Sequence, residues 1–167
     1  CIDHGIFPFG DQCMLQVDMY HQYCPFFTEL LDKLKEGGSI FYSWRIGLGA
    51  DFISLFAYYL SSPLNVFLLF CPPAYVIEFM TILVLLSFAG ASFTAYLIAH
   101  FKIWESGREA FGGLPRPIAA FAAASFGCAY ALSAFMAAYA WNIMWLDCMA
   151  LAPLVLLGSE RLVDGQS

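Results

Sequence analysis

Charged side chains are scarce in this sequence. Asp, Glu, Lys and Arg make up 12% of its 167 residues, whereas soluble domains usually carry about 25%. Hydrophobic residues reach 61%, which is the composition of a membrane protein. The net charge of −6 at pH 7 also lacks the basic excess that attracts nucleic acid. We therefore expect a lipid bilayer around the chain and no nucleic-acid partner.

Several sequence signatures of enzymes are missing. The chain has no GxxxxGK(S/T) loop, no HExxH, no GxGxxG after a strand and no Ser-His-Asp order. Its six cysteines show no CxxC spacing and no regular pairing pattern, although a Cys13–Cys24 disulfide outside the membrane stays open. Hydrolase, zinc-protease and nucleotide-cofactor functions are therefore disfavoured.

The two ends of the chain are typical of a part of a longer protein. The sequence opens with Cys1 and polar residues, without the basic stretch and apolar core of a signal peptide. It stops at SERLVDGQS, just after an apolar segment. We expect the fragment to follow an upstream element and to be inactive by itself.

The first 75 residues predict helices that do not cross the membrane. Apolar side chains recur at helical spacing from residue 26, and Gly37-Gly38 ends this amphipathic helix. Residues 39–52 contain two further glycines and predict a structured loop. Residues 53–71 are apolar but interrupted by Ser61-Ser62-Pro63, so each half is too short to span and favours an interfacial or re-entrant helix.

Three longer apolar segments predict membrane spans at about residues 79–99, 118–139 and 142–162. Small residues recur every four positions along the first two segments, which lets helices approach closely. These residues are Ser87, Ala91 and Ala95, then Ala119, Ala123, Gly127 and Ala131. The expected fold is an all-α polytopic transmembrane helical bundle, with residues 1–75 as a long external loop of juxtamembrane helices.

The basic residues predict the orientation. Residues 100–117 hold three basic residues in one short connection, which places this loop in the cytoplasm. Residues 1–75 and the turn near Trp141 then lie outside. As a consequence, Asp18 and Asp147 fall on the same side of the membrane.

Asp18 and Asp147 are the leading functional candidates, because ionisable groups beside membrane spans are expensive and persist mainly where they work. Asp18 stands in VDMYHQYCPFF and Asp147 in WNIMWLDCMALAPL. The simpler interpretation of Asp18 is a helix cap. For Asp147, it is a polar helix start within an interfacial belt that contains Trp141 and Trp145.

Three segments together resemble the YfhO family of bacterial membrane proteins: YHQYCPFF (20–27), IFYSWRIGLGADFISLFAYYLSSPLN (40–65) and YAWNIMWLDCMALAPLVLLGSERL (139–162). The resemblance covers nearly all of residues 14–164. It implies a multi-pass protein of the bacterial cytoplasmic membrane and a glycosyltransferase of the GT-C class. Such an enzyme moves a sugar from a polyprenyl-phosphate donor to a cell-surface polymer such as lipoteichoic or wall teichoic acid.

The resemblance assigns roles to particular residues. Asp18 matches the acid that serves as base or acceptor ligand, because an attacking hydroxyl must lose its proton, and Asp147 is the second catalytic candidate. Whether a metal takes part stays open, since two carboxylates near a phosphate suit a divalent cation. The substrate-binding candidates are His21, Gln22, Tyr23, Arg45 and Asn142.

Each secondary candidate also has a simpler interpretation. Arg45 suits the geometry of a lipid phosphate or is a solvated loop charge, and His21 is an ordinary loop histidine as readily as a ligand. Tyr58 and Tyr59 are typical interfacial anchors. For the whole protein, the alternative is a membrane transporter or a scaffold for cell-envelope polymers, since acids in membranes also mark transport pathways.

Overall fold

A computed structural model describes residues 2–15, 18–106 and 115–165 of the chain. The fold is all-α apart from one short hairpin, and it divides into two compact units. The first unit comprises Cys1–Leu85 with Trp141–Met144. The second comprises Leu86–Ala140 with Trp145–Ser167. The first unit is therefore discontinuous in sequence, because a short later segment completes it.

The predicted amphipathic helix of the first unit is confirmed as α1 (Cys24–Glu36). It follows directly on a π-helical turn, η2 (Met19–Tyr23). Pro25 occupies the first turn of α1, where its missing N–H is not needed. Gly37 ends the helix with φ of 73°, and its N–H donates to the Lys33 carbonyl at 3.0 Å. The sequence therefore encodes both ends of this helix.

The rest of the first unit consists of short elements. The 39–52 loop contains an antiparallel hairpin with two residues in each strand, a detail that the sequence did not indicate. The hairpin pairs Tyr42 with Asp51 and Ser43 with Ala50. These elements are β1 (Tyr42–Ser43), β2 (Ala50–Asp51), α2 (Phe52–Leu55), η3 (Phe56–Leu60), η4 (Pro63–Phe70), η5 (Pro73–Tyr75) and, before α1, η1 (Ile2–His4).

The chain bends by 108° between Phe52–Leu60 and Pro63–Phe70, at the predicted interruption. Ser62 caps η4 by accepting from the Leu64 N–H at 3.2 Å. The bent pair is a broken span or a re-entrant loop. The fully buried apolar core of the unit includes Phe27, Leu31, Phe52, Leu60, Leu68 and Met80.

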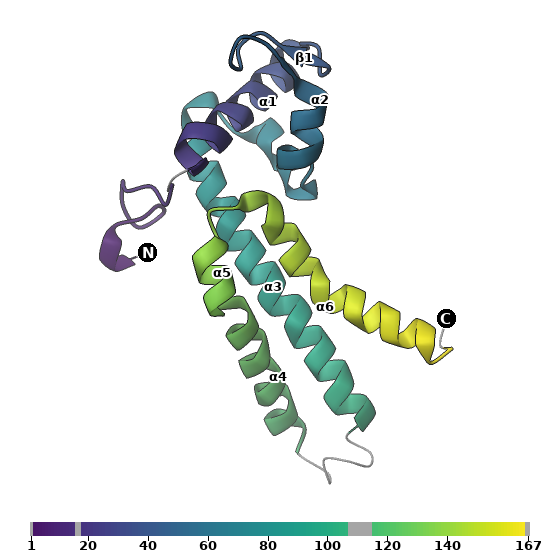
Figure 1. The fold of residues 1–167 in the computed structure, drawn as a ribbon. Helices are drawn as coiled ribbons and strands as arrows, with labels where there is room; N and C mark the ends of the chain where they lie inside the picture. The colour runs from purple at the N-terminus through teal and green to yellow at the C-terminus, as the bar shows by residue number, and fades with distance from the viewer. Residues whose placement is uncertain (1, 16–17, 107–114, 166–167) are drawn as a thin grey trace. The chain divides into compact units, whose positions relative to one another are not determined.

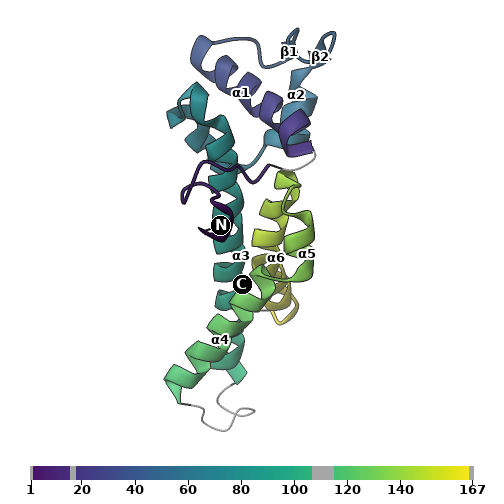
Figure 2. The same cartoon turned by 90° about the vertical axis from the view of Figure 1, so that its left-hand side faces the viewer.

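The second unit is built on long helices (Figures 1 and 2). Within the described residues, three segments are long and apolar enough to cross a membrane: Pro73–Ile103, Arg116–Tyr139 and Ile143–Val163. The helices that form them are α3 (Val76–Ser106), α4 (Arg116–Ala131), α5 (Ala134–Tyr139) and α6 (Ile143–Val163). Each of the three segments predicted from apolar length overlaps one of these candidate spans.

The second span differs from its prediction as one continuous apolar segment. It is interrupted after α4, and α5 restarts with Ser133, whose hydroxyl accepts from the Met136 N–H at 3.4 Å. Serine is one of the residues preferred at this N-cap position, because its side-chain oxygen accepts a bond from a backbone N–H of the first turn. Hydropathy alone did not reveal the break, because the surrounding residues are uniformly apolar.

Small residues pack α4 against α3, as their spacing predicts. Ala91, Ala95 and Ala123 have no exposed surface. A Cβ atom at Gly127 would lie 2.5 Å from the Ser92 carbonyl oxygen, so the two backbones approach closely there. α6 also lies against α3, because Thr94 Oγ1 donates to the Ala150 carbonyl at 2.6 Å.

Two further predictions concern the loop and the cysteines. Residues 107–114 of the expected cytoplasmic loop, with Arg108, lie outside the described residues, so its location stays a prediction. Lys102, on α3, forms an ion pair with Glu160 on α6.

Cys13 and Cys24 are both free thiols, so the disulfide left open by the sequence is not formed.

Candidate functional site

Asp18 directly precedes the π-helical turn η2. It occupies the cap position, with helical backbone angles, but its side chain makes no capping hydrogen bond. The capping role weighed from the sequence is therefore absent. The carboxylate is half-buried and lies close enough to Tyr23 for its charge to act on the phenol.

Tyr23, near Asp18, is both buried and hydrogen-bonded. It is 1% exposed, and its hydroxyl donates to Asn142 Oδ1 at 2.9 Å. Burial raises the pKa of Tyr23 above its usual range, and Tyr59 and the Asp18 carboxylate add to the rise. Tyr23 thus keeps its proton and acts as a fixed hydrogen-bond donor. The structure brings together two residues that the sequence singled out 119 positions apart.

A second π-helical turn, η3, packs against η2. Gln22 Nε2 donates to the Tyr59 hydroxyl at 3.0 Å, and the Tyr23 and Tyr59 rings meet edge to face at 5.4 Å. Phe26 also contacts the Tyr59 ring, at 5.2 Å. π-helical turns are rare in proteins overall, and those that occur are often found at functional sites. Asp18, Gln22, Tyr23, Tyr59 and Asn142 are called the Asp18 cluster below.

Two other predicted site residues, His21 and Asp147, are not among the residues of the Asp18 cluster. His21 is exposed, and its only described ring contact is an edge-on one with Tyr20 at 5.4 Å. Asp147 is half-buried near the start of α6 and belongs to the second unit. Its meeting with Asp18 therefore stays a prediction. Trp145, on the same helix, packs its ring against Tyr139 at 5.9 Å.

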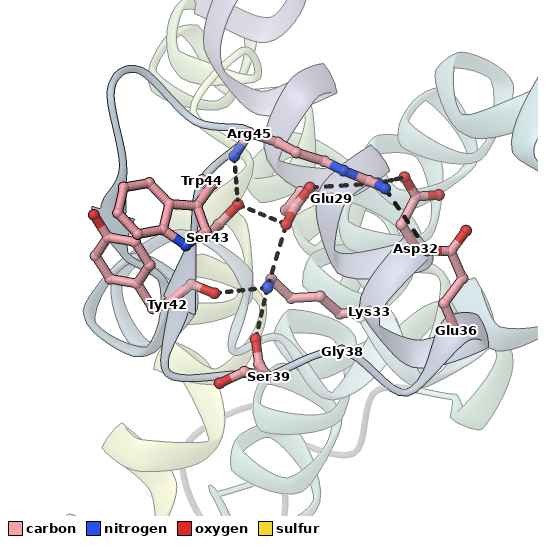
Figure 3. A pocket seen from close by; sticks show the side chains of 10 residues that line it. All are labelled: Glu29, Asp32, Lys33, Glu36, Gly38, Ser39, Tyr42, Ser43, Trp44 and Arg45. Carbon is pink, nitrogen blue, oxygen red and sulfur yellow. Dashed lines mark hydrogen bonds and ion pairs between the residues drawn. The ribbon is translucent and has the colours of Figure 1, made fainter.

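Arg45 lies in a different place, over the polar face of α1 (Figure 3). Its guanidinium bonds Asp32 at 2.5 Å and lies 3.7 Å from Glu36 and 4.0 Å from Glu29. These carboxylates would repel an approaching phosphate. The arrangement therefore favours a role for Arg45 other than the lipid-phosphate contact considered from the sequence.

The described part of the chain contains no cluster of side chains that could hold a metal ion. No group of three or more His, Cys, Asp and Glu side chains is arranged to hold an ion there. Each of the three carboxylates around Arg45 already forms an ion pair with that cation or with Lys33, whose Nζ lies 3.3 Å from Glu29. A metal would have to displace these partners.

The family described as bacterial membrane protein YfhO matches residues 2–167. The chain belongs to the YfhO family. No curated protein and no solved structure matches it. The family and the three apolar helices together make this a multi-pass integral membrane protein.

Sequence reasoning missed part of both sites. Tyr59 was interpreted as an interfacial anchor, and neither the hydrogen bond that it accepts from Gln22 nor its packing on Tyr23 was predicted. The acidic partners of Arg45 were also missed, although a pattern was present. They are Glu29, Asp32 and Glu36, which share one face of α1 by their spacing.

Proposed function

We propose that this protein is a GT-C-type glycosyltransferase that moves a sugar from a polyprenyl-phosphate donor to a cell-surface polymer such as teichoic acid. Membership of the YfhO family supports the class. The single observation that carries the site is an uncapped, half-buried Asp18 beside the buried Tyr23–Asn142 pair. The reaction would take place at the outer face of the bacterial cytoplasmic membrane.

The chemistry requires one proton acceptor. As the hydroxyl oxygen of the acceptor attacks the anomeric carbon, the bond from that carbon to the phosphate oxygen breaks. The hydroxyl proton passes to the Asp18 carboxylate, and the electron pair leaves with the polyprenyl phosphate. Asp18 is free to act because its side chain makes no cap.

The neighbouring residues would hold Asp18 and the substrate in place. Tyr23 is fixed by its bond to Asn142, so the backbone turn that carries Asp18 is anchored to the segment before α6. Gln22 and Tyr59 add a second tie between the two π-helical turns. Such preorganisation lowers the cost of reaching the reactive geometry. Asp147 is retained as a supporting acid, and His21 as a substrate contact.

The test is a replacement of Asp18 in the full-length protein. We expect Asp18→Asn to abolish addition of the sugar to surface polymers in a deletion strain, at equal membrane levels, because the amide cannot accept the proton. Asp3→Asn is the matched control, since Asp3 lies in the separate turn η1 and is exposed. Full transfer by Asp18→Asn would remove Asp18 from the mechanism.

The alternative function is a transporter or scaffold for cell-envelope polymers, since half-buried acids also line transport pathways. The two functions differ in a purified system. A transferase consumes a polyprenyl-phosphate sugar and releases polyprenyl phosphate. A transporter or scaffold leaves the sugar on its lipid.

A further inference from the structure

A cleft of about 360 Å³ lies between α1 and the hairpin in the first unit (Figure 3). Its volume is in the range of small-molecule sites. The cleft is separate from the Asp18 cluster in its lining: none of those five residues borders it. The residues that do are Glu29, Asp32, Lys33, Glu36, Gly38, Ser39, Tyr42, Ser43, Trp44 and Arg45.

The hairpin is fastened to α1 by polar side chains. Ser43 Oγ donates to Glu29 Oε1 at 2.6 Å, within a buried pair. Lys33 Nζ donates to the carbonyls of Ser39 at 2.6 Å and Tyr42 at 2.9 Å. The Ser43 bond and the Lys33 Nζ, 3.3 Å from Glu29 Oε1, satisfy the buried charge of Glu29. The polar base of the cleft is therefore fixed in position.

One wall of the cleft is aromatic. The Tyr42 and Trp44 rings meet at 4.8 Å with 69° between their planes, and Trp44 is 79% exposed. Gly49 makes this packing feasible, because a Cβ there would lie 2.0 Å from Tyr42 Oη. Its φ of +110° also suits glycine alone. The Trp44 indole borders the cleft and is largely uncovered by the protein, so its ring is open to a ligand.

The opposite wall carries hydrogen-bonding groups of both kinds. Arg45, with a side chain 60% exposed, offers N–H donors beyond those used by Asp32. Asp32 and Glu36 offer acceptor lone pairs. Three carboxylates against two cations leave the lining at a net charge of −1, so an anionic ligand is disfavoured.

We propose that this cleft binds a neutral pyranose sugar. One face of a pyranose ring bears C–H groups and suits the Trp44 indole, while its hydroxyls both donate and accept. The carboxylates of Asp32 and Glu36 accept from the sugar hydroxyls, and the Arg45 guanidinium donates to them. The inference rests on the residues of the cleft and does not require transfer chemistry at Asp18.

The test uses the full-length protein in nanodiscs of phosphatidylglycerol and phosphatidylethanolamine. Ligand-detected NMR titrations are run with glucose, galactose and N-acetylglucosamine, and glycerol serves as a hydroxyl-rich probe that lacks a ring face. We expect at least one sugar to bind in preference to glycerol. Trp44→Ala should weaken that binding roughly tenfold, as removal of an aromatic anchor does.

Phe41→Ala is the matched control. Phe41 is an aromatic residue of the same hairpin region, 65% exposed, but it does not line the cleft. Its removal should leave sugar affinity unchanged, whereas Asp32→Asn should lower it by disturbing Arg45. Asp18→Asn should also keep full sugar binding, so loss of transfer in that variant and loss of binding in Trp44→Ala report on separate sites.

Three results would overturn the proposal. The first is the absence of binding for every sugar in the panel. The second is an equal loss from Trp44→Ala and Phe41→Ala together with quenching of Trp44 fluorescence by brominated lipids, which would make the hairpin tip a bilayer anchor. The third is saturable binding of choline at Trp44 without sugar binding, which would assign the acidic, aromatic cleft to a cationic ligand.

Discussion

The two compact units differ in the hydrogen bonds that hydroxyl groups form between separate segments. In the first unit, side chains from distant segments pair with each other, as Tyr23 does with Asn142 and Ser43 with Glu29. In the second, hydroxyls donate to backbone carbonyls of a neighbouring helix, as Thr94 does to Ala150 and Tyr130 to Met149. Side-chain pairs require particular partners, whereas a carbonyl is available at any residue. The hydroxyl partners in the first unit are therefore more specific than those in the second.

Close backbone approach is where the second unit should be least tolerant. Gly127→Leu places its Cβ against the Ser92 carbonyl. We expect destabilisation of about 3 kcal/mol, at the upper end for overpacking, measured as a lower unfolding temperature of the purified protein. Gly158→Leu is the control, since nothing lies within 4 Å of a Cβ there. Equal tolerance of both substitutions would contradict the observed packing of α4 on α3.

The side-chain pairs of the first unit should show a smaller but selective effect. Tyr23→Phe leaves the buried Asn142 without its donor. The expected cost is about 1–2 kcal/mol of unfolding free energy, measured by denaturant or thermal unfolding. Sugar transfer should fall as well, because the turn carrying Asp18 loses its anchor.

Tyr20→Phe provides the matched control for that prediction. Tyr20 is the adjacent tyrosine of η2 but is 56% exposed. Its hydroxyl should be removable within about 0.5 kcal/mol, as at other surface positions. A Tyr20→Phe cost equal to that of Tyr23→Phe would mean that the Tyr23–Asn142 bond contributes nothing specific.

The hydroxyl-to-carbonyl bonds of the second unit should matter least. Thr94→Val removes the bond to Ala150 at nearly constant volume. We expect a cost of about 0.6 kcal/mol, the average for such bonds between membrane helices. Thr81→Val is the comparison on the same helix, because Thr81 bonds the Ile77 carbonyl of its own α3. If Thr94→Val cost as much as Tyr23→Phe, the distinction between the units would fail.

The sequence predicts elements whose periodicity or length is enough to define them. The amphipathic face of α1 could be predicted because its apolar residues recur with a period of 3.6 residues. Its end at Gly37 could be predicted because glycine favours the left-handed conformation that ends a helix. The three spans were readable from apolar length. The π-helical turns η2 and η3 were not, because one extra residue in a turn changes no composition.

The site was predictable in its members but not in its contacts. Gln22, Tyr23 and Asn142 stood out in their segments, but pairing across 119 residues depends on tertiary structure. Arg45 stood out for its charge, while its acidic partners are ordinary surface residues of an amphipathic helix until the hairpin folds over them. Whether Asp18 and Asp147 act together stays a prediction.

The distance along the chain between Tyr23 and Asn142 also determines when their hydrogen bond can form during synthesis. At roughly 5–20 residues per second, the ribosome needs about 6–24 s to make the 119 residues that separate them. During that interval the Tyr23 hydroxyl lacks Asn142, the residue to which it later donates its hydrogen bond. Two apolar segments must emerge first, so the polar cluster closes only after most of this region has been synthesised. A translation product that ends before Asn142 would therefore lack the partner that fixes Tyr23 in the first unit.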